Sequence, residues 1–148
     1  MPFLERPRHN LCFVHVVEGE SDPLPRQRCD ADVLRHLVDG GVNPQMIAVT
    51  PAGCFFVVDA AMLDKVRSTL EPLNVALFVR TGCTRIALQG PYSPPMPSMS
   101  RLLSELSIAG VNVIHFAYEP GAIAALVPTS DANRSAGVFS RFCRRRAA

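Results

Sequence analysis

The chain has 148 residues, of which 48% are hydrophobic and 19% are charged, a balance typical of a folded globular protein. Its formal net charge of +2 is too small to indicate a nucleic acid as a partner. The five cysteines include no C-x-x-C pair, so the sequence indicates neither a zinc site nor a disulfide framework. We therefore expect reduced thiols, no metal and no cofactor.

No apolar run approaches the ~18 residues that a membrane span needs. The first residues also lack the apolar segment of a secretory signal peptide. We therefore expect a cytoplasmic protein that does not bind membranes.

The first half of the chain alternates between strand and helix patterns. Residues 11–17 (LCFVHVV) are apolar and β-branched, which predicts a buried strand. After a polar, proline-containing loop, residues 27–39 carry apolar side chains at helical spacing and end at a Gly-Gly pair, which predicts a helix. Residues 46–49 and 54–58 flank a Pro-Ala-Gly turn and predict a β-hairpin.

A second helix and a third strand pattern complete this half. Residues 60–70 predict the helix, which ends before Pro72, and residues 75–79 predict a strand. The resulting order is βαββαβ, in which two helices cover one face of an antiparallel sheet. Residues 81–84 (TGCT) predict a turn rather than a flexible linker.

The second half repeats these patterns. Residues 85–89 predict a strand, and a helix with inward-facing leucines follows the proline-rich loop of residues 90–98. A second strand pair comes next, and residues 131–142 predict a final helix.

One stretch of the sequence occurs twice. The tripeptide Gly-Val-Asn at positions 41–43 recurs at positions 110–112, an offset of 69 residues. The same offset pairs Pro51 with Pro120 and continues to the end of the next strand. A constant offset through a helix end, a turn and a strand end indicates an internal duplication. The predicted fold class is therefore α+β, with two tandem ferredoxin-like βαββαβ units.

The second unit lacks a closing strand after its last helix. Because an open sheet edge must be paired or covered, residues 3–6 are predicted to supply that strand. The alternative is a disordered N-terminus and a three-stranded second sheet. We expect domains at residues 11–80 and 81–143, an N-terminal segment at residues 1–10 and a solvated basic tail at residues 144–148.

The repeated pattern resembles a known family. A helix ending in Ala-Gly-Val-Asn-Val, followed by a strand pair that ends in a valine-rich strand, looks like an ACT domain, the amino-acid-sensing module. Two such units in tandem resemble the regulatory region, or the small regulatory subunit, of aspartokinase. The resemblance covers residues 11–143 and is strongest at residues 85–90 and 102–113.

The resemblance implies a regulatory protein and not an enzyme. It implies that an amino acid, lysine or threonine first, binds the chain and allosterically regulates an aspartokinase-like catalytic partner. It also implies a homodimer, because an ACT sheet presents strand edges and an apolar helix face to a second copy.

An ACT-type site would lie between the loop that precedes a helix and the strand start of a neighbouring unit. There, amides at the helix N-terminus hold the carboxylate of the ligand, while a carboxylate or carbonyl groups hold its ammonium group. The corresponding residues of the first unit are Ser21, Asp22, Leu24, Asn43, Pro44 and Gln45. Those of the second unit are Ser98, Asn112 and Val113.

Asp22 is the candidate partner for the ammonium group, although a plain turn aspartate is an equal alternative. Asn43 and Asn112 are alternatively helix caps in the left-handed region. Residues 93–98 of the second loop contain three prolines and no acid, so we expect the second unit to be structural and the first to hold the ligand.

Two further hypotheses compete with amino-acid sensing. Aspartokinase ACT loops usually carry a Pro-Gly step before the helix, but here Pro25 precedes Arg26 and Pro97 precedes Ser98. This departure favours an assembly module that no longer binds a ligand. The third hypothesis is a small enzyme on a ferredoxin-like scaffold, with Cys29 near a helix start as its candidate thiol.

Overall fold

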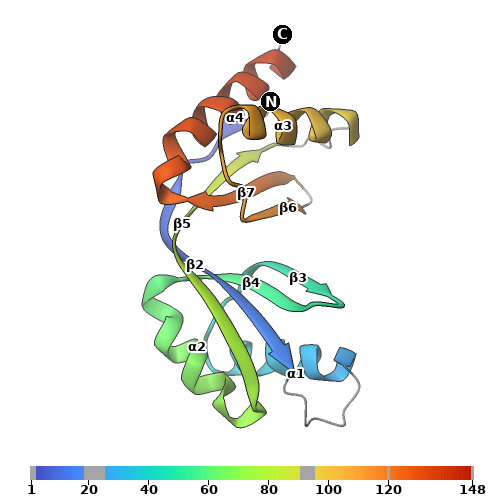
Figure 1. The fold of residues 1–148 in the computed structure, drawn as a ribbon, viewed down its shortest axis with the longest axis vertical. Helices are drawn as coiled ribbons and strands as arrows, with labels where there is room; N and C mark the ends of the chain where they lie inside the picture. Colours follow the sequence, from blue (N-terminus) through green and yellow to red (C-terminus); the bar gives the residue numbers. More distant parts are fainter. Residues whose placement is uncertain (1–2, 19–25, 91–95, 120, 148) are drawn as a thin grey trace. The chain divides into compact units, whose positions relative to one another are not determined.

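The computed structural model describes residues 3–18, 26–90, 96–119 and 121–147. The chain forms two compact units (Figure 1). We call Asn10–Thr81 the N-unit, and Gly82–Ala148 together with Met1–His9 the C-unit. Each unit is a mixed layer of antiparallel strands and helices, which confirms the predicted combination of antiparallel sheet and helix.

Six long elements form the N-unit. They are β2 (Arg8–Glu18), α1 (Arg26–Asp39), β3 (Gln45–Thr50), β4 (Gly53–Asp59), α2 (Leu63–Leu70) and the first half of β5 (Val75–Gln89). Short 3-10 turns flank α2 at Ala60–Met62 and Glu71–Leu73. The strand order is β3-β4-β2-β5, and β4 pairs antiparallel with both β2 and β3.

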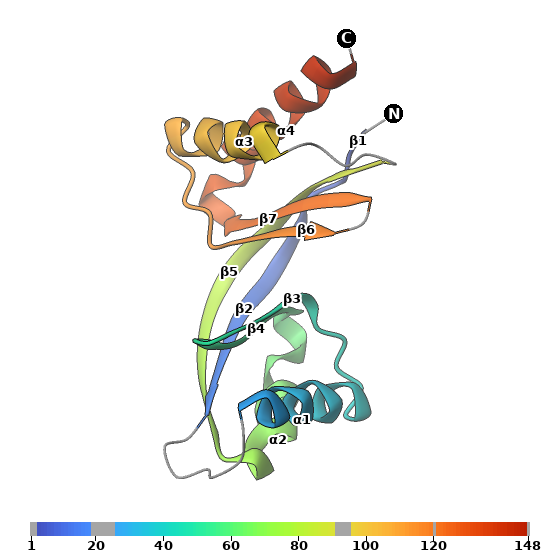
Figure 2. The ribbon, with the colours of Figure 1, turned by 90° about the vertical axis from the view of Figure 1, so that its right-hand side faces the viewer.

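Alternating side chains of β2 and β4 explain why both helices lie on one face of this sheet. The buried members on β2 are Cys12, Val14 and Val16, and those on β4 are Cys54, Phe56 and Val58. Val33 and Leu37 of α1 and Val66 and Leu70 of α2 pack against them. A strand turns every second residue to the same face, so one face of the sheet forms the core. Figure 2 gives a second view of the same elements.

The C-unit is built from the remaining elements. They are β1 (Phe3–Leu4), the second half of β5, α3 (Met96–Ile108), β6 (His115–Glu119), β7 (Ala122–Pro128), a 3-10 turn (Thr129–Asp131) and α4 (Ala132–Ala147). β7 pairs antiparallel with β5 on one side and with β6 on the other. β1 pairs with β5, with Phe3 opposite Gln89 and Leu4 opposite Leu88. The first described residues therefore form a short strand against the C-terminal end of β5.

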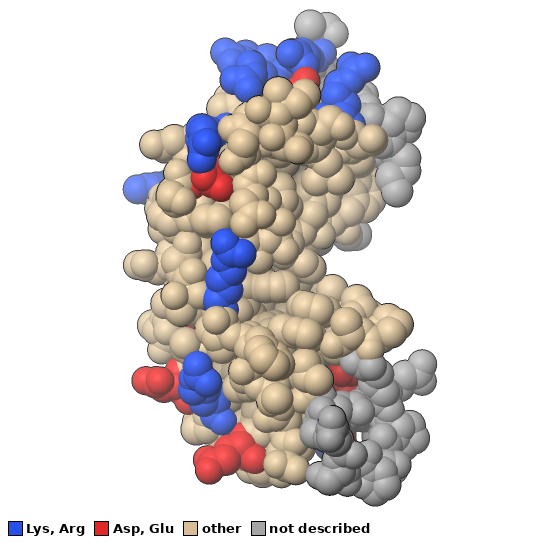
Figure 3. Space-filling model, in the orientation of Figure 1, with Lys and Arg blue, Asp and Glu red and all other residues tan. Residues whose placement is uncertain are grey.

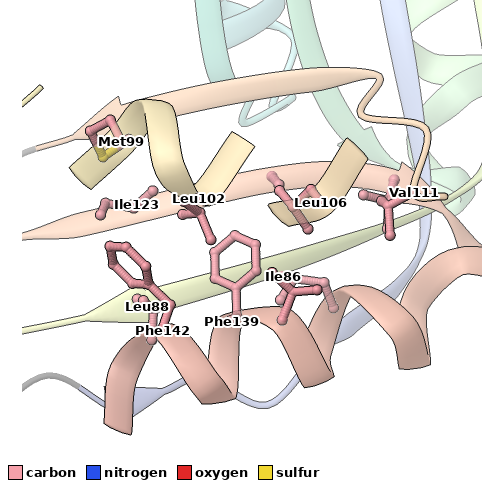
Figure 4. Close-up of a cluster of buried hydrophobic side chains, with 12 residues drawn as sticks. Ile86, Leu88, Met99, Leu102, Leu106, Val111, Ile123, Phe139 and Phe142 are labelled. Carbon is pink, nitrogen blue, oxygen red and sulfur yellow. The ribbon is translucent and has the colours of Figure 1, made fainter. Parts of the chain in front are cut away.

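The core of the C-unit lies between its sheet and its two helices. Figure 4 shows Leu102 and Leu106 of α3 and Phe139 of α4 pointing toward Ile86 on β5. These four side chains are fully buried. At ~25 cal/mol for each Å² of apolar surface removed from water, burial of such side chains is the main stabilising contribution in this unit.

The two copies of the repeat end their helices in the same way. In α1, the amide of Gly41 donates to the carbonyl of Val38 at 3.0 Å, and that of Val42 donates to Leu37 at 2.8 Å. In α3, Gly110 and Val111 make the equivalent bonds to Ser107 and Leu106, each at 3.0 Å. Both glycines have left-handed backbones, with φ of 80° at Gly41 and 75° at Gly110. This is the Schellman cap of a helix, and it occurs twice at the predicted offset.

Two parts of the chain differ from the sequence expectations. Residues 81–84, expected to form a turn, lie inside the single continuous strand β5. Cys83 and Thr84 pair with Pro128 and Val127 of β7, and the Thr84 hydroxyl bonds Thr129 Oγ1 at 2.9 Å. Thr84 is β-branched, and β-branched residues favour strands. This preference and the pairing with β7 together outweigh the turn tendency of residues 81–84.

The second difference concerns the C-terminus. The sequence predicts that the final helix ends at Phe142, but α4 continues to Ala147, so residues 144–147 are helical. Cys143 packs against the core, and Arg145 forms an ion pair with Glu105 of α3. These contacts, and the favourable interaction of arginine with a helix C-terminus, extend the helix.

The charges are unevenly distributed over the sequence. The C-unit contains nine basic and four acidic residues, whereas the N-unit contains six basic and nine acidic residues, giving formal net charges of +5 and −3. Five of the arginines lie in α4, which contains no acid. Figure 3 shows basic side chains gathered where α4 ends.

Candidate ligand-binding site

The described half of the expected site in the N-unit is the segment that joins α1 to β3. After the cap at Gly41, Val42 turns into the core and is 2% exposed. Asn43 is exposed, and Pro44 and Gln45 are half-buried. Gln45 is the first residue of β3 and pairs with Val57 of β4. The structure thus places Asn43, Pro44 and Gln45 together at the start of an edge strand.

The backbone immediately after these residues has an uncommon conformation. Met46 has a φ of 49°, in the left-handed region that side chains other than glycine rarely adopt, and it is 4% exposed. The pairing of β3 with β4 shifts register between Gln45 and Ala48. Such bulges change the direction in which the side chains of a strand point, so this one affects the direction of the Gln45 side chain.

The equivalent segment of the C-unit is held by a carboxylate. The amide of Asn112 donates a hydrogen bond to Asp131 Oδ2 at 3.0 Å. Asp131, which is 8% exposed, also forms an ion pair with Arg134, and its carbonyl accepts a bond from Ser135 Oγ at 2.8 Å. Val113 is half-buried against the core. The amide of Asn112 therefore already has a strong acceptor within its own unit.

The two units differ at this point. At the offset of 69 residues, Met62 corresponds to Asp131, and Asn43 corresponds to Asn112. Both Met62 and Asp131 are the last residues of 3-10 turns, so the local structure is the same. Because methionine has no carboxylate, the N-unit lacks the contact that holds Asn112.

The other candidates are placed as follows. Ser21, Asp22 and Leu24 lie outside the described residues. Ser98 is the third residue of α3. The alternative interpretation of Asn43 and Asn112 as left-handed helix caps is wrong, because Gly41 and Gly110 take that role. Glycine adopts a positive φ without the steric cost of a Cβ atom, which is why the cap falls on it.

Three histidines have hydrogen-bond partners of a structural kind. His15 Nε2 lies 2.6 Å from the carbonyl of Ala52, and His36 Nδ1 lies 2.8 Å from that of Asp32. His9 Nδ1 lies 2.9 Å from Thr84 Oγ1. No group of three potential metal ligands occurs in the part of the chain that the structure describes.

A chain of hydrogen bonds determines the proton positions around His9. The hydroxyl of Thr129 donates to the carbonyl of Gly82 at 2.9 Å. Thr129 Oγ1 must then accept the proton of Thr84, whose oxygen is left to accept from His9 Nδ1. His9 is therefore a donor at Nδ1, and its contact joins the start of β2 to β5.

Cys12 and Cys54 show no sign of activation. Burial raises the pKa of Cys12. Burial, with a smaller contribution from the nearby Asp30 carboxylate, raises the pKa of Cys54 to about 11. A reactive thiol needs a lowered pKa, so neither sulfur is suited to nucleophilic chemistry. Cys29, the candidate thiol, has a backbone within α1, and its side chain lies outside what the structure describes.

The chain is similar in fold to regulatory parts of aspartokinases. It matches the ligand-free regulatory subunit of aspartate kinase from Thermus thermophilus with a TM-score of 0.74 and 15% identity, over 95% of each chain. It matches a structure of aspartokinase alpha and beta subunits with a TM-score of 0.76 and 11% identity, over 97% of each chain.

A third match is to a longer enzyme. E. coli aspartokinase III in complex with lysine and aspartate, in its T-state, aligns with a TM-score of 0.68 and 18% identity. The alignment covers 92% of this chain but only 32% of that one.

Comparison by sequence identifies no relative. No protein-family model matches the chain. No curated protein matches it either. Among the described residues, no helix is both long enough and apolar enough to cross a membrane.

The resemblance to the regulatory region of aspartokinase, first indicated by the repeated pattern, is shown at the level of the fold by these structural matches.

Proposed function

We propose that the chain is an amino-acid-binding allosteric regulatory module of the aspartokinase type. The observation that carries this proposal is the alignment of 95% of the chain with 95% of a regulatory subunit. The module would act by binding a catalytic partner of the aspartokinase kind. The complex would have two arrangements, and the ligand would bind one of them more tightly. This difference in affinity would shift the equilibrium toward the arrangement that binds the ligand better.

The proposal includes the finer architecture. We assign residues 11–80 and 81–143 to two tandem ACT-type domains, each a βαββαβ unit, with the segment 1–10 completing the second. The paired helix caps at Gly41 and Gly110 support this assignment. The pairing of β1 with β5 also supports it, because it adds a fourth strand to β5-β7-β6.

The ligand site is assigned to the N-unit. Asn43, Pro44 and Gln45 form one wall, and the loop with Ser21, Asp22 and Leu24 would form the other. Asp22 would pair with the ammonium group, while amides at the start of α1 would hold the carboxylate. Lysine and threonine are the first ligands to test, and lysine is present in the E. coli enzyme complex.

The C-unit is assigned a structural role. Asp131 already accepts the hydrogen bond that the backbone amide of Asn112 donates, so this amide is less available to a ligand carboxylate. A negative charge at this position would also repel that carboxylate. Ser98, Asn112 and Val113 would then line a site that remains closed.

Isothermal titration calorimetry with lysine and threonine tests the ligand assignment. We expect a binding isotherm that Asp22→Asn weakens at least about tenfold, since a charge-assisted hydrogen bond is lost. Asn112→Ala is the matched control in the C-unit and should leave the affinity unchanged. Absence of heat and of any thermal shift with all common amino acids would remove the sensing role.

The chain is also proposed to be a homodimer. β3 in the N-unit and β6 in the C-unit are edge strands, and edge strands pair readily with a second copy. The outer face of α3 carries a groove of about 600 Å³ lined by Met99, Ser100, Leu103, Ser104 and Ser107. A second copy of α3 could pack closely against these small and apolar side chains.

One observation favours an assembly module without a ligand. Neither helix start carries a Pro-Gly step, because Arg26 follows Pro25 and Ser98 follows Pro97. A side chain there restricts the approach of a ligand to the backbone. Co-purification of a kinase-like partner, with an affinity that no amino acid changes, would support this alternative.

A further inference from the structure

A pocket of about 310 Å³ lies in the N-unit where α2 ends and β5 begins, and its lining shares no residue with the segment that joins α1 to β3. Its lining residues are Arg67, Leu70, Glu71, Asn74, Val75 and Leu77. Leu70 is buried and forms an apolar floor, while Arg67, Glu71 and Asn74 are exposed around it. Volumes of ~300 Å³ are at the small end of ligand pockets, so the pocket suits a metabolite rather than a nucleotide.

The pocket presents one positive and one negative side chain on the same helical face. Arg67 and Glu71 are four residues apart, and the amide of Glu71 donates to the carbonyl of Arg67. This spacing brings their Cβ atoms to ~5–6 Å from each other. Among the residues that the structure describes, neither side chain takes part in an ion pair.

The order of the two charges explains why they do not satisfy each other. On a helix, an acid four residues before a base pairs better than a base four residues before an acid. Here the base comes first. An exposed pair of this kind also contributes less than ~1 kcal/mol, so an external ligand loses little by replacing it.

The backbone at the mouth of the pocket is held in one conformation. Asn74 has a φ of 52°, and its amide donates to the carbonyl of Glu71 at 3.3 Å. This left-handed residue ends the turn and turns the chain into β5, so that Val75 and Leu77 line the same pocket. The amide side chain of Asn74 can both donate and accept hydrogen bonds.

We propose that this pocket binds the head group of an α-amino acid, with its carboxylate on Arg67 and its ammonium group on Glu71. The planar guanidinium group can donate two parallel hydrogen bonds to a carboxylate. The carboxylate of Glu71 accepts from the ammonium group, and Asn74 completes the polar rim. A ligand with only one of the two charges leaves the other protein charge unsatisfied. The site is additional to the one proposed beside Asn43.

Titration of the ¹⁵N-labelled full chain, followed by NMR, tests the inference. The probes are glycine and lysine, which carry both charges of the head group, and acetate and methylammonium, which carry one each. We expect both amino acids to shift the amide signals of Asn74 and Leu77, and the single-charge probes to shift them far less.

Variants identify the groups that bind. Arg67→Gln and Glu71→Gln each remove one charge at similar size and should weaken the binding up to about fivefold, as expected for an exposed charge contact. Arg35→Gln, which removes an exposed arginine elsewhere in the N-unit, should change nothing. Because the altered side chains are exposed, unchanged circular dichroism is expected for all three.

The result separates the two amino-acid sites. Shifts at Asn74 and Leu77 that persist in Asn43→Ala support the pocket independently of the proposed function. Shifts confined to residues 43–45 would overturn the pocket and leave the proposed function intact. Equal shifts with acetate alone, or unchanged affinity in Glu71→Gln, would also overturn it.

Discussion

Gly41 and Gly110 show how a single residue type ends two helices in the same way. Each has a left-handed backbone and donates to a carbonyl three residues earlier. The residue that follows each glycine then buries its side chain in the core of its own unit. The conformation of one residue therefore sets the direction in which the chain enters the next strand.

Replacement of Gly110 by alanine should destabilise the protein. A Cβ atom in the left-handed region costs ~1–2 kcal/mol, while its nearest neighbour, Arg134 Nη1 at 3.3 Å, can move aside. Gly137→Ala is the matched control, because Gly137 lies inside α4 and an added Cβ would be 3.7 Å from Arg141. That change should stabilise by ~0.5–1 kcal/mol. Urea denaturation measures both, and equal signs would refute the role of the cap.

Asp131 holds the segment after α3 through the amide of Asn112. Asp131→Ala should lower the free energy of unfolding by ~1–3 kcal/mol, because the amide loses its acceptor. Asp131→Asn keeps a carbonyl oxygen in place and should cost less. Hydrogen exchange at Asn112 should accelerate in the alanine variant and much less in the asparagine variant. Similar exchange in both would show that the contact is dispensable.

The pKa of Cys54, raised to about 11 by burial and by Asp30, predicts its reactivity. Its thiol remains protonated at pH 8, so a maleimide should label the half-buried Cys143 before Cys54 and Cys12. The folded pKa lies above the ordinary value of 9.0, so the folded state favours the neutral thiol. The resulting stability is complete below pH 9 and falls as the pH rises toward 11. Early labelling of Cys54 would contradict this.

At the scale of the elements, β5 and β1 depend on contacts that are distant in sequence. β5 is one strand of 15 residues, although the local sequence of residues 81–84 predicts a turn. β1 has only two residues and gains its partner through β5 and through the bond from the amide of Glu5 to Ala87, at 2.9 Å. Such a short strand would not form in isolation.

Glu5 strengthens this attachment. Its carboxylate lies 2.5 Å from Arg85 Nη1, and the Arg85 side chain is only 10% exposed. Glu5→Ala should lower the free energy of unfolding by ~2 kcal/mol, because it leaves a largely buried guanidinium group unpaired.

An exposed pair provides the comparison. Arg35→Ala breaks the ion pair with Asp32 in the N-unit, where the arginine is 64% exposed, and should cost less than ~1 kcal/mol. Urea denaturation at low salt measures both variants. Equal costs would mean that Glu5 does not anchor β1.

At the scale of the whole molecule, the proposed dimer makes a direct prediction. Light scattering at micromolar concentration should give twice the mass of one chain. Leu103→Asp, on the lining of the α3 groove, should shift the equilibrium toward the monomer, because it places a charge in an apolar contact. Ile108→Asp on the same helix, 86% exposed and outside that lining, should not. A monomer mass for the unaltered chain would refute the dimer.

The sequence by itself determined the features that depend on neighbouring residues. The helices and the two helix-ending glycines follow from local periodicity and from the backbone freedom of glycine, and the repeat follows from comparing the chain with itself. For the same reason, the local pattern alone assigns Asn43, Pro44 and Gln45 to the start of a strand.

Only the tertiary structure decided what depends on distant partners. The continuity of β5, the extension of α4, and the bond between Asp131 and Asn112 each depend on segments that no local pattern relates. Local propensity contributes at most ~1 kcal/mol per residue, and strand pairing, burial and charge contacts between remote segments outweigh it.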